Sequence, residues 1–318
     1  MRKTGLLVIG AGTAGLAAAQ YGARAGLDVT VLEGPEPGGQ ALNIEALENY
    51  PGWSGSGRDF AAALRLQAEG FGAKFMNASA LSLEIFGKGS GRYFSVTMED
   101  GVLQAKAVIL ALGAEPRKLD IPGEEEFYGM GVSYCAACDG PFFRNKKILV
   151  IGGGDAACDS ARALARIAAS VTIVHRRGEL RAQKAVAERV LKDERIKVML
   201  NYAPSKIQGG GQVHSVVLIS TETRKKIEEA ADAVFIYAGL VARNGIVQKP
   251  ELIEKPELDE YGFIVTGQDM STSVSGLFCA GDLRASAFRQ VVTAASDGAV
   301  AAHSAAAYID QTLENNTQ

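Results

Sequence analysis

The N-terminal part of the chain combines apolar runs with a glycine-rich turn and an alanine-rich stretch. Residues 5–9 are Gly-Leu-Leu-Val-Ile, without a polar side chain, which is typical of a buried parallel strand. After the glycine-containing residues 10–15, an alanine-rich helical pattern continues to about Ala25, and a second apolar run at 29–32 ends on Glu33. The pattern predicts a strand, a glycine turn, a helix and a second strand with an acidic residue at its end.

The turn between the first strand and the helix reads Gly10-Ala11-Gly12-Thr13-Ala14-Gly15, the GxGxxG spacing of dinucleotide-binding turns. Glycines let the backbone approach a pyrophosphate, and the helix N-terminus attracts the anion. Glu33 stands where a carboxylate accepts hydrogen bonds from ribose hydroxyls. The uncharged run from Thr4 to Ala23 would also fit a signal peptide or a short membrane span, although its glycines argue against both. We expect this segment to bind a dinucleotide with a free ribose, such as FAD or NAD.

The same unit occurs a second time, 142 residues further along the chain. Val8-Ile9-Gly10-Ala11-Gly12 aligns with Val150-Ile151-Gly152-Gly153-Gly154, and 11 of the 28 positions from Leu6 to Glu33 are identical without a gap. Gly15 is replaced by Ala157, a variant that such turns tolerate. A copy this deep in the chain is not a signal peptide, which removes that interpretation for the first copy as well.

The two copies differ at the position that contacts the ribose. Glu33 aligns with His175, which is followed by Arg176, Arg177 and, a little later, Arg181. A carboxylate would repel a 2′-phosphate, whereas arginines bind one through paired hydrogen bonds. A solvated strand end would also account for His-Arg-Arg, but the alignment with the ribose-contacting position favours NADP(H) as the ligand of the second copy.

A further pattern is shared by both copies. Residues 107–113 resemble residues 233–239, and alternating segments at 92–98 and 213–220 predict a small antiparallel meander in each copy. The glycines of residues 87–91 predict a hairpin turn in the first of them. Each copy is therefore expected to be a complete nucleotide-binding domain.

The remaining residues are too few for a third domain of this kind. They contain a predicted strand that ends on Gly281-Asp282 and a helix from about Arg289 to Tyr308, and both need a host sheet. The sequence therefore predicts an α/β fold of two Rossmann-like three-layer nucleotide-binding domains, the second inserted in the first. The expected boundaries are 1–114 with 245–318 for the first domain and 115–244 for the second.

Composition narrows the classes of protein further. Apolar residues make up 47% and charged residues 22% of the 318, which excludes a disordered or collagen-like chain. The 33 Lys and Arg residues are balanced by 36 Asp and Glu, and the net charge of −3 argues against a nucleic-acid partner. We expect no membrane partner either. Four cysteines in a chain of this length are not a secreted disulfide framework.

Two of the cysteines are spaced as a CxxC motif. Cys135 and Cys138, followed by Asp139, suit a reversible disulfide or half of a zinc site. Zinc would need two more ligands, and neither Cys158, Cys279 nor the three scattered histidines have paired spacing, so we expect no metal. A purely structural pair is the other alternative. We favour a redox dithiol, in which Asp139 exchanges a proton with sulfur, while Cys158 and Cys279 are buried apolar residues.

Together these features resemble the low-molecular-weight thioredoxin reductases, from about Leu6 to Tyr308. The segments that carry the resemblance are Cys135–Gly140, His175–Arg177 with Arg181, Pro37–Gln40, Glu48–Gly52 and Gly281-Asp282 followed by Arg289-Gln290. The resemblance implies a cytoplasmic homodimer that uses FAD and NADPH to reduce the disulfide of thioredoxin or a thioredoxin-like protein.

The resemblance also implies roles for the matching residues. In the first domain, FAD would be bound by Gly10, Gly12, Thr13, Ala14, Gly15, Glu33, Gly39, Gln40, Asn49, Gly281, Asp282, Arg289, Gln290 and Val291. In the second domain, NADPH would be bound by Gly152, Gly154, Asp155, Ala156, His175, Arg176, Arg177 and Arg181. Cys138 would face the flavin, Cys135 would attack the thioredoxin disulfide, and Asp139 would donate the proton.

A nicotinamide and a dithiol carried by one domain cannot occupy the same flavin face together. We therefore expect the second domain to rotate about linkers near Glu115-Pro116 and Arg243-Asn244. The second linker lacks the proline of the Gly-x-x-Pro-Asn turn that is common in the family.

Three other functions compete with this interpretation. They are a related flavin-dependent reductase with a different partner, such as a peroxidase-reducing protein; one with a different electron donor, NADH or ferredoxin; and a flavin redox sensor without turnover. The intact arginine cluster favours NADPH as the donor.

Overall fold

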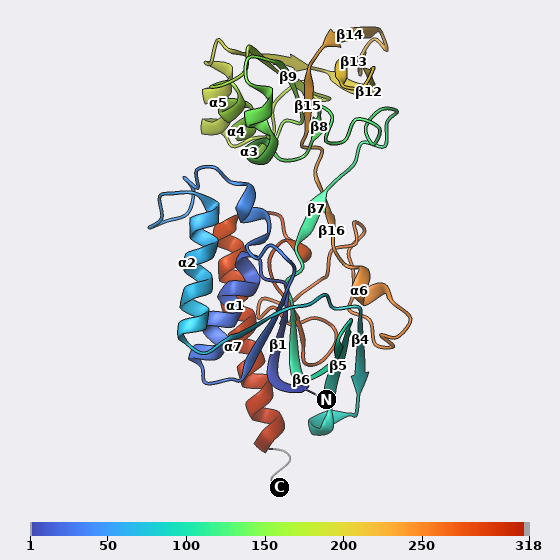
Figure 1. The fold of residues 1–318 in the computed structure, drawn as a ribbon. Helices are drawn as coiled ribbons and strands as arrows, with labels where there is room; N and C mark the ends of the chain where they lie inside the picture. Colours follow the sequence, from blue (N-terminus) through green and yellow to red (C-terminus); the bar gives the residue numbers. More distant parts are fainter. Residues whose placement is uncertain (1, 315–318) are drawn as a thin grey trace. The chain divides into compact units, whose positions relative to one another are not determined.

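A computed structural model describes residues 2–314 of the chain, which form two compact units. Unit 1 holds the chain up to Glu115 and again from Val241, and unit 2 holds Pro116–Leu240 (Figure 1). The nucleotide that each unit binds stays a prediction. No helix among residues 2–314 is both long enough and apolar enough to cross a bilayer.

Unit 1 is built on a seven-stranded sheet. Its strands are β1 (Arg2–Ile9), β2 (Val29–Glu33), β3 (Lys74–Asn77), β4 (Ser82–Phe86), β5 (Tyr93–Met98), β6 (Gly101–Leu110) and β17 (Leu277–Cys279). The order is β3-β2-β1-β6-β5-β4, and β17 pairs in parallel with the C-terminal end of β6, whose N-terminal half pairs antiparallel with β5. The C-terminal strand therefore belongs to the same sheet as the first glycine turn.

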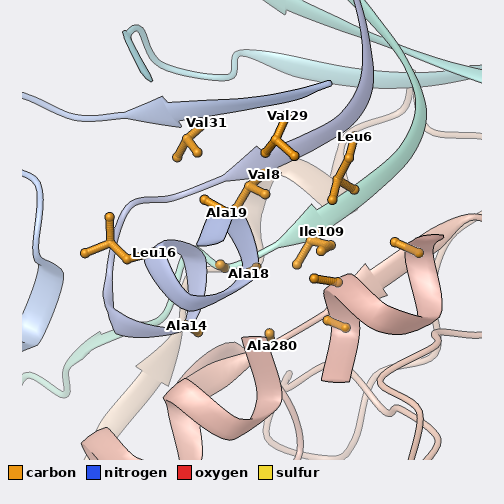
Figure 2. Packing of buried hydrophobic residues seen from close by; sticks show 14 of the residues in the cluster. Leu6, Val8, Ala14, Leu16, Ala18, Ala19, Val29, Val31, Ile109 and Ala280 are labelled. Carbon is orange, nitrogen blue, oxygen red and sulfur yellow. The ribbon is translucent and has the colours of Figure 1, made fainter. Parts of the chain in front are cut away.

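The helices of unit 1 are α1 (Thr13–Arg24), α2 (Gly57–Gly70), α6 (Gly245–Gln248) and α7 (Val291–Glu314). Short 3-10 turns lie at Gly39–Asn43, Gly89–Gly91 and Gly281–Leu283. Alanines of α1 and α7 share one buried cluster with Leu6, Val8, Val29 and Val31, and these small side chains let both helices approach closely (Figure 2). This packing fixes the start of α1 above the carboxyl end of β1.

Unit 2 has a parallel sheet in the order β11-β10-β9-β15-β8 and a separate antiparallel meander. The strands are β8 (Val132–Ser133), β9 (Lys147–Ile151), β10 (Ser170–His175), β11 (Ile196–Leu200), β12 (Tyr202–Gly209), β13 (Val213–Ser220), β14 (Lys226–Ala230) and β15 (Ala233–Ile236). Its helices are α3 (Ala136–Asp139), α4 (Asp155–Leu164) and α5 (Lys184–Leu191), with a 3-10 turn at Gly140–Phe143.

Successive side chains of β9 point to opposite faces of the sheet and are covered on both faces, which gives unit 2 its three layers. Ile148 and Val150 pack into one buried cluster with residues of α4 and α5, whereas Leu149 and Ile151 pack into another with residues of the meander. Side chains of a strand point alternately to the two faces of a sheet, so both faces of β9 are covered. The predicted fold class, α/β with two Rossmann-like domains, is confirmed.

The internal repeat is preserved in strand register. Leu6 pairs with Val29 in unit 1, and the residues 142 positions later, Ile148 and Val171, pair in unit 2. The resemblance between residues 107–113 and 233–239 is preserved too, because β6 and β15 each lie directly beside the first strand of their unit. The two sheets are therefore copies of one plan.

The two connections between the units form a ladder of their own. Strand β7 (Ala114–Pro116) pairs with β16 (Leu240–Ala242), so each linker passes through a short strand (Figure 1). The sequence Gly239–Asn244, which lacks the family's proline, contains β16. Proline would remove a backbone donor from such a strand.

Candidate functional site

The first glycine turn closes tightly over the end of β1. A Cβ on Gly15 would collide with the carbonyl oxygen of Gly10, so α1 can begin this close to the strand only with glycine at that position. The chain after β2 returns to the turn, where Gly38 N–H donates to Ala11 O at 2.8 Å, and Gly39 lies against Gly12. The turn and the Gly39–Gln40 loop thus line one patch of closely packed backbone, as a pyrophosphate site requires.

Glu33 ends β2 as a buried carboxylate with a defined partner. Its Oε2 accepts a 2.7 Å hydrogen bond from Arg65 Nη1 of α2, and the Arg65 guanidinium lies over the Phe75 ring at 4.5 Å. The ion pair compensates a charge that burial would otherwise destabilise. Arg65 therefore holds Glu33 as an oriented carboxylate at the position predicted for the adenosine ribose.

Residues far apart in the sequence meet near the first turn. Asn49 Nδ2 donates to Gln290 Oε1 at 2.9 Å across 241 positions, and a Cβ on Gly281 would approach the Ala14 Cβ to 2.8 Å. Gln40 Nε2 donates to Ala114 O at 3.2 Å. The structure thus joins segments of the predicted FAD set that come from both ends of the chain.

Charged side chains complete this region. Burial raises the pKa of Asp282, although the nearby Arg289 acts in the opposite direction. The Arg289 guanidinium lies over the Phe263 ring at 3.9 Å. Val291 is the first residue of α7, directly after Gln290. Asp282 follows Gly281, which lies against Ala14, so a carboxylate with a nearby cation lies close to the start of α1.

The second glycine turn is braced by the loop that follows β10. Arg181 N–H and Ala182 N–H both donate to Gly153 O, at 2.6 and 3.0 Å, and Asp155 accepts hydrogen bonds from the backbone and side chain of Gln183. The His175 ring packs directly on Gly153, where a Cβ would come within 2.5 Å of the imidazole. The glycine turn and the residues after β10 therefore form one connected surface.

Three arginines surround the buried His175. Its pKa is lowered, mainly by burial and then by the positive charges of Arg177, Arg176 and Arg181. All three arginine side chains are exposed. The end of β10 is therefore a positive surface, whereas the equivalent end of β2 carries the carboxylate of Glu33.

Two buried polar atoms in these regions lack a hydrogen-bond partner within the described part of the chain. They are His175 Nε2 in unit 2 and Arg289 Nε in unit 1. Buried polar groups in folded proteins are normally satisfied, so unsatisfied atoms at both predicted nucleotide sites fit the binding of polar ligands there. A further such atom, Trp53 Nε1, directly follows the Glu48–Gly52 segment.

The CxxC motif forms a disulfide between Cys135 and Cys138. Cys138 is exposed and Cys135 is half-buried, at the start of α3. Ser133 Oγ accepts from Cys135 N–H at 3.0 Å and donates to Asp139 Oδ2 at 2.6 Å, and Cys138 N–H points at Cys135 Sγ at 3.1 Å. The predicted proton carrier Asp139 is thus tied to the same segment as both sulfurs.

The other two cysteines are buried thiols. Burial, with the charges of Asp159 and Asp155, raises the pKa of Cys158 to about 11, and burial also raises that of Cys279. Both therefore stay protonated at neutral pH, as expected for apolar core residues. Within residues 2–314, no group of three or more His, Cys, Asp or Glu side chains is arranged to hold a metal ion.

Sequence reasoning missed Arg65 and Ser133. Arg65 lies on α2, in a stretch without a motif, and reaches Glu33 only because α2 packs beside the sheet. Ser133 precedes Cys135 by two residues. A hydroxyl so close to a CxxC motif could have been singled out from the sequence as a candidate partner of the motif. The partner of such a hydroxyl, Asp139, depends on how the chain turns at α3.

Comparisons with known proteins agree with this geometry. Residues 4–298 match the family described as pyridine nucleotide-disulphide oxidoreductase. Among curated proteins, the thioredoxin reductase of Treponema pallidum is 50% identical over 312 residues, covering 98% of each chain, and that of Listeria innocua is 42% identical, covering 97% of this chain and 95% of the relative. The crystal structure of Lactococcus lactis thioredoxin reductase (FR conformation) is similar with a TM-score of 0.92 and 40% identity, covering 97% of this chain and 99% of that one.

Proposed function

Because the chain belongs to the pyridine nucleotide-disulphide oxidoreductase family, we propose that it is an NADPH-dependent flavoenzyme that reduces the disulfide of thioredoxin or a thioredoxin-like protein. The similarity to thioredoxin reductases over nearly the whole chain confirms the resemblance and identifies an oxidoreductase. The observation that carries the finer proposal is the Cys135–Cys138 disulfide, which lies in the same unit as the arginine-lined glycine turn.

The residues of unit 1 fit FAD. The turn from Gly10 to Gly15 would hold the pyrophosphate, and Glu33, oriented by Arg65, would accept the adenosine ribose hydroxyls. The joined segments around Asn49, Asp282 and Gln290 would hold the ribityl chain and the ring. When bound, NADPH would supply a hydride, and FAD would supply the means of passing the electron pair on.

The residues of unit 2 fit NADPH. The turn from Gly152 to Gly154 would approach the pyrophosphate, and Arg176, Arg177 and Arg181 would hold the 2′-phosphate. Because the Glu33 carboxylate would repel that phosphate, the two units would accept different dinucleotides.

The dithiol would pass electrons to the partner by thiol–disulfide exchange. Reduction of the Cys135–Cys138 disulfide takes up two electrons and two protons. The Cys135 thiolate would then attack the partner disulfide to form a mixed disulfide, and Cys138 would break it, which restores the disulfide and leaves a reduced partner. Asp139, held by Ser133, would carry a proton to or from sulfur.

Unit 2 would rotate about the β7 and β16 linkers so that nicotinamide and dithiol reach the flavin in turn. The support is that the CxxC motif and the residues predicted to bind NADPH lie in unit 2, whereas the residues predicted to bind FAD lie in unit 1. A covalent cross-link between the units should block turnover and spare one half-reaction. Full turnover in the cross-linked protein would contradict rotation.

The decisive experiment follows NADPH oxidation with and without oxidised thioredoxin. The wild-type protein should consume NADPH and produce thioredoxin thiols, whereas Cys138→Ser should keep NADPH reduction of the flavin and lose thioredoxin reduction. Continued thioredoxin turnover by Cys138→Ser would contradict the dithiol route, and flavin reduction without any partner turnover would indicate a redox sensor. We further propose a cytoplasmic homodimer; sedimentation of the purified protein tests the dimer, and fractionation of cells tests the compartment.

A further inference from the structure

Tyr237 lies where the dinucleotide turn and the redox segment of unit 2 meet. It directly follows β15, and its N–H donates to Ile151 O at 2.7 Å, at the end of the strand that leads into the second glycine turn. The backbone of Gly152 lies against it, since a Cβ there would approach the Tyr237 carbonyl oxygen to 2.6 Å. The position of this tyrosine is thus set by the sheet and by the turn.

The phenol of Tyr237 reaches from the sheet to the CxxC motif. Its oxygen accepts a 3.1 Å hydrogen bond from Ala136 N–H, and the Ser160 side chain of α4 lies near it. Burial raises the pKa of the phenol, so it stays neutral. Ala136 N–H belongs to the peptide group that joins Cys135 to Ala136, and the hydroxyl therefore holds the backbone directly at the first sulfur-bearing residue.

This contact gains importance when the disulfide is reduced. In the oxidised protein the S–S bond itself holds Cys135 Sγ beside Cys138 N–H, at 3.1 Å. After two electrons and two protons have been added, this covalent bond is gone, and hydrogen bonds and the packing of Ala136 hold the segment. A backbone N–H that points at a thiolate stabilises it and lowers the pKa of the thiol.

We propose that Tyr237 is a positioning residue of the redox centre: its hydroxyl fixes the Cys135–Ala136 peptide so that, in the reduced enzyme, Cys135 Sγ stays within reach of Cys138 N–H and remains a reactive thiolate. The inference rests on the proposed function of the Cys135–Cys138 pair. Tyr237 touches neither sulfur and acts through the backbone.

The test measures thiol reactivity without NADPH or thioredoxin. The holoenzyme is reduced with dithiothreitol, desalted without oxygen and alkylated with iodoacetamide over a series of pH values, and modification of Cys135 is followed by mass spectrometry. Tyr237→Phe should raise the midpoint of the pH profile by about 0.7 pH unit, a change of about five-fold in the ionisation constant of the thiol, as expected for one lost hydrogen bond. An unchanged midpoint would overturn the proposal.

Tyr134→Phe is the matched control. It removes the hydroxyl of the residue that precedes Cys135 in the sequence. This hydroxyl donates to the Glu124 carboxylate and not to the backbone of the Cys135–Cys138 segment. The control should keep the wild-type midpoint, and an equal rise in both variants would overturn the proposal. If Tyr237→Phe does not fold, Ser160→Ala removes the hydroxyl that lies near the same phenol and should raise the midpoint by a smaller amount. No rise in that variant would be the contrary result. A wild-type Cys135 with an ordinary thiol midpoint would overturn this inference but not the proposed function, which the NADPH and thioredoxin assay tests separately.

Discussion

Ser133 Oγ donates a 2.6 Å hydrogen bond to Asp139 Oδ2 and accepts one from Cys135 N–H, so one hydroxyl joins the expected proton carrier to the backbone of the first sulfur residue. Ser133→Ala should lower thioredoxin turnover about five-fold, because Asp139 loses the contact that orients it. Steady-state kinetics with thioredoxin measure the effect. Ser205→Ala, which removes a hydroxyl bond to Val217 O elsewhere in unit 2, should leave turnover unchanged. Equal losses in both variants would contradict a specific role for Ser133.

Nucleotide preference should depend on the arginines after β10. The double variant Arg176→Ala, Arg177→Ala should raise the KM for NADPH by about 100-fold and that for NADH little, since two charge-assisted contacts to the 2′-phosphate are lost. Initial rates with the two nucleotides measure the ratio. Arg195→Ala removes one exposed arginine charge that is already bound to Asp193 and should keep the wild-type preference. The specificity argument is wrong if the double variant has the same NADPH to NADH ratio as the wild type.

Flavin retention should depend on Arg65. Arg65→Met leaves the buried Glu33 carboxylate without its cation, and we expect a loss of about 1–3 kcal/mol in the free energy of unfolding and weaker FAD binding. Urea unfolding and titration of the apoprotein with FAD measure the two effects. Glu69→Gln breaks the other ion pair of Arg65, which is more exposed, and should change both quantities little. FAD affinity equal to that of the wild type would contradict the role given to Arg65.

Stability should fall in mild acid because of His175. Its pKa in the folded protein is lowered, chiefly by burial, so the unfolded chain binds the proton more readily. The stabilisation from the neutral imidazole is complete above about pH 6.5 and is lost as the pH falls below that value, by at most about 1.4 kcal/mol per pH unit. Urea unfolding at about pH 7.5 and about pH 5.5 should show a smaller drop for His175→Gln than for the wild type. The same drop in both proteins would rule out His175 as the cause.

Local sequence was sufficient for the elements that repeat. The shift of 142 residues predicted the second turn, and the paired strands keep that shift because apolar runs and glycines specify strand, turn and helix start within a few neighbouring residues. The sequence also predicted opposite charges at the ends of the two second strands, Glu33 in one copy and Arg176–Arg177 in the other. This was possible because the end of that strand has a constant position in the motif. Element ends were less accurate. β1 begins at Arg2 because residues 2–4 pair with β6, and α7 continues to Glu314, beyond the predicted end at Tyr308.

The chain by itself determined the two glycine turns, the CxxC pair and the nested order of the units. Only the tertiary structure decided which side chains form hydrogen bonds to residues of these segments. Arg65 contacts Glu33, Gln290 contacts Asn49, and Tyr237 contacts the Cys135–Ala136 peptide. These contacts join residues on different elements, up to 241 positions apart. Periodicity and motif spacing describe which face of an element is buried, whereas a hydrogen bond between two elements depends on how their packed surfaces bring single atoms within about 3 Å.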